Sequence, residues 1–261
     1  MQRRLTQGEI NAIERLAKAK TSIIEISRTL HIARATVYYH ARNHCRKMSK
    51  LNLNSLSELE EGYMLGFFLG DGSFNKGHKS PRFIVRFALD AKRDQDIARK
   101  LVDILTKGHK KASVFSRGNN LIVKVCSKGL VEYIMTFVEY RPNKRAKEEK
   151  TFLMKKDHSK DFKLGILAGI IDSDGHVHEH LGTEIKTVSP SMLSTILGLL
   201  ATFGIEAKVK IRMATTSSYS KKPCYAIYIP STLMVAFQNI IPSIKVERAS
   251  RLHLNKPRKV N

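Results

Sequence analysis

Two acidic residues, Asp71 and Asp174, stand at the ends of two apolar segments of similar composition. The first segment covers residues 64–72 and the second covers residues 167–175, and in each a glycine directly follows the acid. Both segments read as helices whose ends are marked by that glycine. A carboxylate at a helix C-terminus opposes the helix dipole, so its presence in both copies indicates a use other than helix formation.

The chemistry of these acids depends on whether they meet. Each segment carries a pair of small residues four positions apart, which lie on one helical face. Such a face lets a second helix approach closely. Packed face to face, the segments would bring Asp71 and Asp174 together at one end. The predicted interface residues are Gly66, Gly70, Gly169 and Ser173.

Two adjacent carboxylates favour a divalent cation between them. Without one, their repulsion strongly raises one of the two pKa values. Carboxylate oxygens suit Mg²⁺, Mn²⁺ or Ca²⁺. We therefore predict a Mg²⁺ site, which Mn²⁺ or Ca²⁺ would also fit, at Asp71 and Asp174 with Gly70 and Ser173 beside them. The alternative is two amphipathic helices that each end in an acid.

Both segments resemble the signature of the LAGLIDADG homing endonuclease family. The second is almost identical to it, whereas in the first Leu69 replaces the motif's first acid and Gly70 replaces its alanine. The resemblance covers about residues 58–245 and implies the single-chain form with two motifs. It implies that Asp71 and Asp174 bind metal and act in catalysis.

The same resemblance implies a lysine near the acids. Lys128 begins the last helix of the first half and is the candidate, with a role in stabilising charge or orienting water. The corresponding position in the second half is about Ser231, so Lys221 or Lys222 would have to substitute there. A plain surface charge is the alternative for Lys128.

Composition favours a nucleic-acid partner. The chain has 261 residues and a formal net charge of +23, which points to a polyanion. No apolar run is long enough to span a membrane, and the first residues lack the apolar core of a signal peptide. Three widely spaced cysteines form neither a zinc pattern nor a disulfide framework. We expect an intracellular protein in a reducing compartment.

Residues 1–48 predict a small all-α unit. Thr6 with Glu9, and Ser22 with Glu25, form two capping boxes ahead of apolar periodic runs. His31 takes a turn position that requires positive φ, before a third helix over about 33–44. The unit resembles a helix-turn-helix, with a structural cap as the alternative. The third helix would read DNA through Arg34, Thr36, Tyr39 and Arg42.

The rest of the chain predicts two similar halves, residues 49–140 and 161–261, joined by a charged connector over 141–160. Each half reads helix-strand-strand-helix-strand-strand-helix. One hairpin turns at Gly118-Asn119, and strands of the second half are expected near 175–181 and 183–189. The basic tail from Lys245 would lie on the surface or on DNA. The fold class is α+β, with two four-stranded antiparallel sheets forming a pseudo-twofold saddle for DNA.

Basic residues alternate with apolar ones on the predicted strands and so share one face. Most would bind phosphate, which positions the protein without reading sequence. Three histidines at spacings of two follow the second motif; we predict DNA contacts, with zinc binding or plain surface as alternatives. The predicted contacts are Arg82, Arg86, Lys124, Lys208, Lys210 and Arg212, together with His176, His178 and His180.

These features predict a monomeric, metal-dependent endonuclease that hydrolyses both strands of double-stranded DNA. Water would be the attacking group, because no Ser/His/Asp or Cys/His arrangement can be placed. Two different halves in one chain would suit a non-palindromic target. The family resemblance implies a link to introns and leaves open whether the gene is intron-encoded or free-standing. A DNA-binding transcription regulator on the same scaffold and an intron RNA maturase are the alternatives.

Overall fold

The structure is a computed structural model. It describes residues 5–19, 21–42, 44, 53–75, 83–108, 111–141, 149–153, 158–178, 180, 182–213, 223–237 and 240–254. The chain divides into two compact units, Met1–Lys50 and Leu51–Asn261, which are described separately. In the described part, no helix is both long and apolar enough to cross a membrane.

The first unit consists of three helices, α1 (Gln7–Lys18), α2 (Ile23–Thr29) and α3 (Arg34–Ala41). Thr6 and Glu9 form a complete capping box on α1, and the Ser22 hydroxyl accepts from the Glu25 amide on α2. One small core joins the helices, built from Ile13, Ala17, Ile26, Ile32, Val37 and Ala41.

The turn between α2 and α3 has the geometry that its sequence predicts. His31 has φ of 51°, the left-handed conformation that histidine tolerates better than bulky residues. The Ser27 hydroxyl donates to the carbonyl oxygen of Ile32 at 2.7 Å and so ties α2 to the start of α3.

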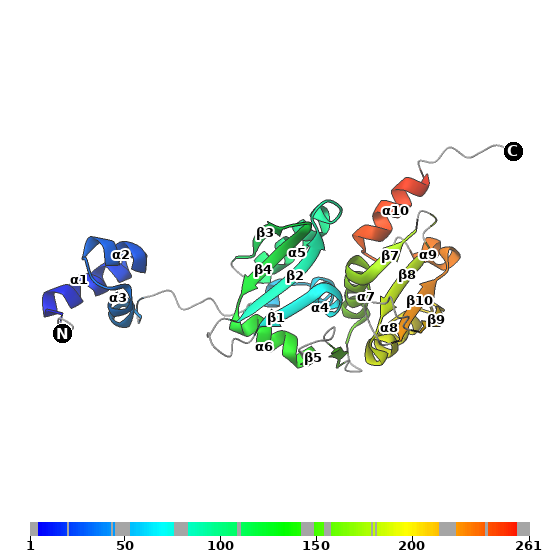
Figure 1. The fold of residues 1–261 in the computed structure, drawn as a ribbon, viewed down its shortest axis with the longest axis horizontal. Helices are drawn as coiled ribbons and strands as arrows, with labels where there is room; N and C mark the ends of the chain where they lie inside the picture. Colours follow the sequence, from blue (N-terminus) through cyan, green and yellow to red (C-terminus); the bar gives the residue numbers. More distant parts are fainter. Residues whose placement is uncertain are drawn as a thin grey trace. The chain divides into compact units, whose positions relative to one another are not determined.

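The second unit repeats one sequence of elements twice (Figure 1). The first half contains α4 (Glu58–Asp71), β1 (Gly72–Asn75), β2 (Ile84–Asp90), α5 (Gln95–Gly108), β3 (Ser113–Arg117), β4 (Asn120–Cys126) and α6 (Lys128–Phe137). The second half contains α7 (Lys160–Asp174), β7 (Gly175–Val177), β8 (Thr183–Thr187), α8 (Pro190–Thr202), β9 (Lys208–Arg212), β10 (Cys224–Ile229) and α9 (Ser231–Phe237). This is the predicted order, and the α+β class is confirmed.

Each half forms a four-stranded antiparallel sheet, in the order β1-β2-β4-β3 and β7-β8-β10-β9. Alternation decides which side chains reach the core, so Val85, Phe87 and Leu89 of β2 are buried beneath helices. One continuous core connects both halves through α4 and α7, which lie side by side between the sheets (Figure 1).

Two segments differ from their predictions. The connector is partly ordered into a two-stranded sheet, β5 (Val138–Arg141) with β6 (Glu149–Phe152). The described part of the tail, up to Leu254, is helical as part of α10 (Ile244–Leu254), and it docks on the core through Val246 and Ala249, which are buried. Their spacing of three fits one helical face, a pattern that the many charges of this segment conceal.

Candidate functional site

The two motif helices approach each other through glycines. A Cβ added to Gly66 would lie 2.7 Å from the carbonyl carbon of Ile166, and one added to Gly169 would lie 2.5 Å from the amide nitrogen of Phe67. Both obstructing atoms belong to backbone, which cannot move aside as a side chain can. Gly66 and Gly169 therefore sit at the helix crossing, as their spacing predicts.

The glycine face extends one turn further than predicted. Gly62 of α4 and Gly165 of α7 also face the partner backbone, Gly62 towards Phe162 and Gly165 towards Leu59. The small residues thus occupy every fourth position on both helices. Their spacing was present in the sequence and could have identified the longer interface.

The C-terminal ends of the helices meet at the acids. A Cβ on Gly70 would collide with the Ser173 side chain and would lie 3.2 Å from the carboxyl carbon of Asp174. The Asp71 side chain is exposed at its tip and lines a surface pocket, with protein on its other sides. This desolvation, followed by the charge of Asp174, raises the pKa of Asp71 to about 6.

A lysine caps the end of each motif helix. Lys150 on β6, only 7% exposed, donates to the carbonyl oxygens of Phe68, Leu69 and Gly70 at 2.8, 3.1 and 2.8 Å. It therefore satisfies the last carbonyls of α4 and complements the helix dipole.

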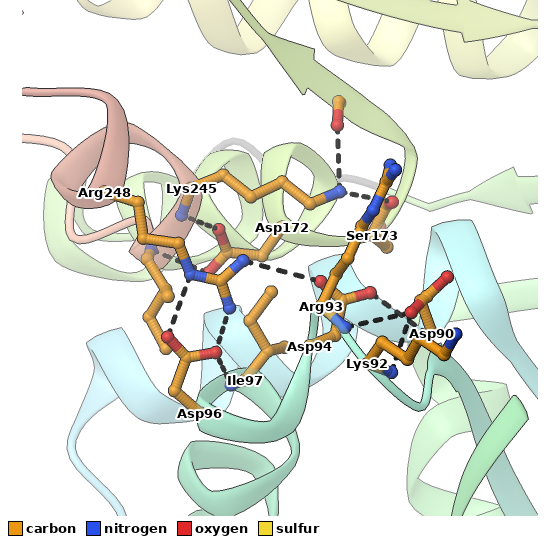
Figure 2. Close-up of polar contacts among 12 residues, drawn as sticks. Asp90, Lys92, Arg93, Asp94, Asp96, Ile97, Asp172, Ser173, Lys245 and Arg248 are labelled. Atoms are coloured by element: carbon orange, nitrogen blue, oxygen red, sulfur yellow. Dashed lines mark hydrogen bonds and ion pairs between the residues drawn. The ribbon is translucent and has the colours of Figure 1, made fainter. Parts of the chain in front are cut away.

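Lys245 on α10 does the same for α7. Its ammonium group donates to the carbonyl oxygens of Ser173 at 3.0 Å and Gly175 at 2.9 Å (Figure 2). The positive charges of Lys245 and Lys150 both oppose the rise in the pKa of Asp71. Each motif helix thus ends in an acid, beside a lysine from later in the chain: Lys150 comes from the connector and Lys245 from the second half.

The predicted lysine, Lys128, lies elsewhere. Its ammonium group pairs with Glu132 at 3.5 Å and lies 5.8 Å from the centre of the Phe83 ring, largely exposed. Lys150 and Lys245 are the lysines beside the acids instead. Ser231, at the corresponding position of the second half, begins α9. The proposed substitutes, Lys221 and Lys222, lie outside the described residues.

The donor set fits a cation that needs few protein ligands. In the described part of the chain, no three His, Cys, Asp or Glu side chains gather into a metal site. Two carboxylates suit Mg²⁺, which commonly binds through one or two of them and completes its shell with water and substrate phosphate. The Gly70 and Ser173 carbonyl oxygens accept from Lys150 and Lys245, and the Ser173 hydroxyl donates to Gly169 at 2.9 Å, so the acids are the natural ligands.

The acids open onto a surface pocket of about 540 Å³. The pocket runs from the end of α4 to the end of β8 and the start of α8 and is therefore shared by both halves. Its lining consists of Leu69, Gly70, Asp71, Gly72, Lys150, Asp174, Lys186, Thr187, Val188, Ser189, Met192 and Cys224.

The outer face of the first sheet carries a basic pair. Arg86 on β2 lies opposite Lys124 on β4, and Ser73 of β1 lies opposite Arg86 on the other side. The strand β1 begins directly after Asp71, so this row crosses the sheet close to the acid. Arg82 lies outside the described residues.

On the second sheet, Lys208 and Lys210 of β9 share the outer face with Tyr228 and Ala226 of β10. This pairing places both lysines on the face that alternation predicts. The inner face of β9 is less covered by helices than expected, because β9 is an edge strand: Ile211 is 63% exposed.

Arg212 on the same strand forms an ion pair within the protein. The Glu184 carboxylate of β8 accepts from Arg212 at 3.0 Å and also pairs with Lys186 at 3.0 Å.

Two of the three histidines lie together on this face. His176 and His178 make an edge-to-face contact with 4.5 Å between ring centres, and both are exposed. The strand β7 ends at Val177, so His180 falls in a turn and not on the expected longer strand.

The predicted recognition helix α3 presents most of its candidates to solvent. Arg34, Tyr39 and Arg42 are exposed, and Thr36 is half-buried. The Arg42 guanidinium lies 4.7 Å from the centre of the Tyr39 ring.

Family models match both halves. A LAGLIDADG-like domain matches residues 161–242, and a WhiA LAGLIDADG-like domain matches residues 60–155. The chain belongs to the LAGLIDADG family. As a LAGLIDADG protein it carries two copies of the motif helix, each ending in an acid. A comparison with curated proteins gives no match.

Solved structures share the fold of this LAGLIDADG protein. I-DmoI in complex with DNA and calcium is 16% identical, with a TM-score of 0.52 over 76% of this chain and 98% of that chain. The homing endonuclease I-WcaI bound to its DNA recognition sequence is 15% identical, with a TM-score of 0.51 over 84% and 93%. The N-terminal LAGLIDADG domain of WhiA is 15% identical, with a TM-score of 0.48 over 77% and 91%.

Proposed function

We propose that this protein is a divalent-metal-dependent endonuclease that cuts both strands of one DNA site. The observation that carries the proposal is the junction of α4 and α7, where Asp71 and Asp174 meet between Lys150 and Lys245. I-DmoI and I-WcaI, whose folds are similar, were solved on DNA, and I-DmoI with a divalent cation.

Each charged group has a role that its position supports. Asp71 and Asp174 would hold Mg²⁺, with Mn²⁺ or Ca²⁺ fitting the same oxygens. When bound, the ion supplies Lewis-acid polarisation of a phosphodiester and a lowered pKa for coordinated water. Lys150 and Lys245 hold fixed positive charge beside the place where negative charge develops on the phosphate, a preorganised arrangement that favours the transition state.

The basic faces of the two sheets would hold the duplex over the acids. Arg86 and Lys124 serve the first half, and Lys208 and Lys210 serve the second, mainly through phosphate. His176 and His178 follow Asp174 and would contact DNA next to the cut. Because the halves differ and lie in one chain, the protein would act as a monomer on a non-palindromic site.

The three-helix unit would extend the target. Arg34, Thr36, Tyr39 and Arg42 of α3 would enter the major groove, the usual role of a third helix in this arrangement.

A DNA-binding regulator is the second candidate. The match of residues 60–155 to a WhiA LAGLIDADG-like domain favours it, together with the three-helix unit. The two acids favour the nuclease, since a regulator has no use for carboxylates that repel phosphate.

The deciding experiment incubates the full chain with a pooled library of DNA duplexes and Mg²⁺ and sequences the cut ends. We expect recovery of one site cut in both strands, and no cutting by Asp71→Asn or Asp174→Asn, which should still bind the same site. Binding of a site without cutting by the unaltered protein, in Mg²⁺ or Mn²⁺, would favour the regulator.

A further inference from the structure

Helix α10 is anchored to parts of both halves. Its first turn is held by a buried acid of α7, and its middle reaches an acid of α5 in the first half (Figure 2). From the first turn of α10, the Lys245 side chain extends to the end of α7. Helix α10 is therefore held by directed polar contacts as well as by its buried apolar residues.

The anchor on α7 is Asp172, which is only 1% exposed. Its carboxylate accepts from the amides of Ile244 and Lys245, both at 3.0 Å, and from the hydroxyl of Ser243 at 2.6 Å. It also accepts from the Tyr63 hydroxyl of α4 at 2.7 Å. A carboxylate at the free amides of a helix N-terminus is favourable in both hydrogen bonding and dipole interaction.

The anchor on the first half is Asp96. The Arg248 side chain binds it through two nitrogens, with Nε at 2.9 Å, and a further nitrogen lies 3.7 Å from Asp94. Lys100 of α5 also donates to the carbonyl oxygen of Pro242 at 2.6 Å, just before α10. A paired arginine fork fixes direction as well as distance.

We propose that α10 is a positioning element, in which Asp172 and Arg248 hold Lys245 at the active centre and make its placement depend on the first half. This inference rests on the proposed nuclease function. Lys245 lies in a pocket of its own, lined also by Asp94, His176 and Arg248, whereas Lys150 lines the pocket that contains both acids. In this proposal, Lys150 and Lys245 serve different strands of the duplex, because they line different pockets.

The same arrangement explains one of the differences between the two motifs. Asp172 is the first acid of the second motif, and its counterpart in the first motif is the buried Leu69. Lys150 lies on strand β6, which pairs with β5, so it is not carried by a helix whose N-terminus an acid would cap. An acid at this motif position is therefore useful only in the second motif, where the lysine lies on a helix whose N-terminus the acid caps.

The test compares Arg248→Ala with Arg251→Ala. Arg251 is a matched control on the same helix, because it pairs with Glu247 of α10 itself and not with the first half. Two readouts are used on the full chain. The first is acylation of Lys245 by acetic anhydride, followed by mass spectrometry without DNA. The second is the rate of cutting of each separately labelled strand in the duplex recovered from the library.

We expect Arg248→Ala to raise the acylation rate of Lys245 several-fold. It should slow the cutting of one strand by at least about tenfold, as is usual when an outer partner of an active-site group is lost. The other strand and the KM for DNA should change little, so nicked DNA accumulates. Arg248→Lys should partly restore both the low acylation rate of Lys245 and the cutting rate of the affected strand. Asp96→Asn removes the same contact from the other side and replaces Arg248→Ala in the test if Arg248→Ala does not fold.

Unchanged acylation in both Arg248→Ala and Asp96→Asn would overturn the proposal, and so would equal slowing of both strands. If the unaltered protein cuts no DNA, the nuclease function fails. The acylation result then decides whether α10 holds Lys245 in place.

Discussion

Gly66 of α4 faces the backbone of Ile166 of α7 with no space for a side chain: an added Cβ would lie 2.7 Å from the carbonyl carbon. Gly66→Ala should therefore destabilise the protein by about 1–3 kcal/mol or more, because overpacking a close contact forces backbone to shift. Thermal unfolding measures the loss.

The control is Gly198→Ala in α8. A Cβ there meets nothing within 4 Å, so alanine should stabilise the helix by roughly 0.5–1 kcal/mol. Equal melting temperatures for Gly66→Ala and the unaltered protein would contradict the close helix crossing.

Asp71→Asn should change how the protein responds to pH. The pKa of the Asp71 carboxyl is about 6 in the folded protein against an ordinary 3.8, so the folded state holds this proton more tightly. Its favourable contribution is complete below the ordinary pKa and is lost as the pH rises through about 6. In metal-free buffer at pH 7, Asp71→Asn should melt at the same temperature as the unaltered protein or above it.

Divalent cations should reverse that order. Mg²⁺ at ten times its Kd should stabilise the unaltered protein by about 1.4 kcal/mol, a rise of roughly 2–4 °C per kcal/mol for a domain of this size. The rise in melting temperature caused by Mg²⁺ should be much smaller in Asp71→Asn. An equal rise in both proteins would mean that the cation does not bind at Asp71.

Lys150→Met should be far more damaging than Lys128→Met. The first change removes the ammonium donor of the Leu69 and Gly70 carbonyl oxygens and leaves the Phe68 oxygen with the Gly72 amide alone. It also removes a charge that lowers the pKa of Asp71. An unpaired buried polar group costs about 1–3 kcal/mol. Cutting should fall steeply while DNA affinity changes little.

Lys128→Met removes only an exposed pair with Glu132, worth about 0–1 kcal/mol. Comparison of cutting rates and melting temperatures for the two variants checks the assignment. A greater loss of cutting in Lys128→Met than in Lys150→Met would show that Lys128 is the lysine that acts at the site, as the family resemblance implies.

Replacing Lys208 and Lys210 with Ala should weaken DNA binding without changing the preferred site. Each lost phosphate contact lowers the log–log salt slope by about 0.9, so the double variant should lose up to about 1.8. Adding Arg212→Ala should contribute less than a full contact, because Glu184 already pairs with Arg212. Affinity measured at several salt concentrations gives the slope.

Glu184→Gln is the opposing variant. It frees Arg212 and Lys186 from their shared carboxylate, and should tighten binding and steepen the slope. A slope unaffected by all three substitutions at Lys208, Lys210 and Arg212 would mean that this face does not touch DNA.

Deleting residues 1–50 should leave a folded protein, because the second unit has its own continuous core. The shortened chain should bind DNA more weakly and still cut it, since both acids lie in the second unit. Circular dichroism and cutting assays check the two parts of this prediction. A folded but wholly inactive fragment would show that the three-helix unit belongs to the catalytic body.

Local patterns in the sequence determined much of this protein. Alternation placed Val85, Phe87 and Leu89 in the core, and the four-residue spacing of small residues identified the helix crossing at Gly66 and Gly169. Both patterns repeat every two or four residues, so they are visible in one short segment. The positive φ of His31 is equally local, because a turn depends on its neighbours.

Only the tertiary structure decided which lysines stand beside the acids. Lys150 and Lys245 lie more than 70 positions after Asp71 and Asp174 in the chain, and nothing in their charged surroundings distinguishes them from other lysines. Their placement follows from the β5–β6 pairing and from the anchoring of α10 by Asp172, a contact with Ser243 that spans 71 positions. Contacts of this kind depend on the packing of the whole domain, so no local pattern in the sequence records them.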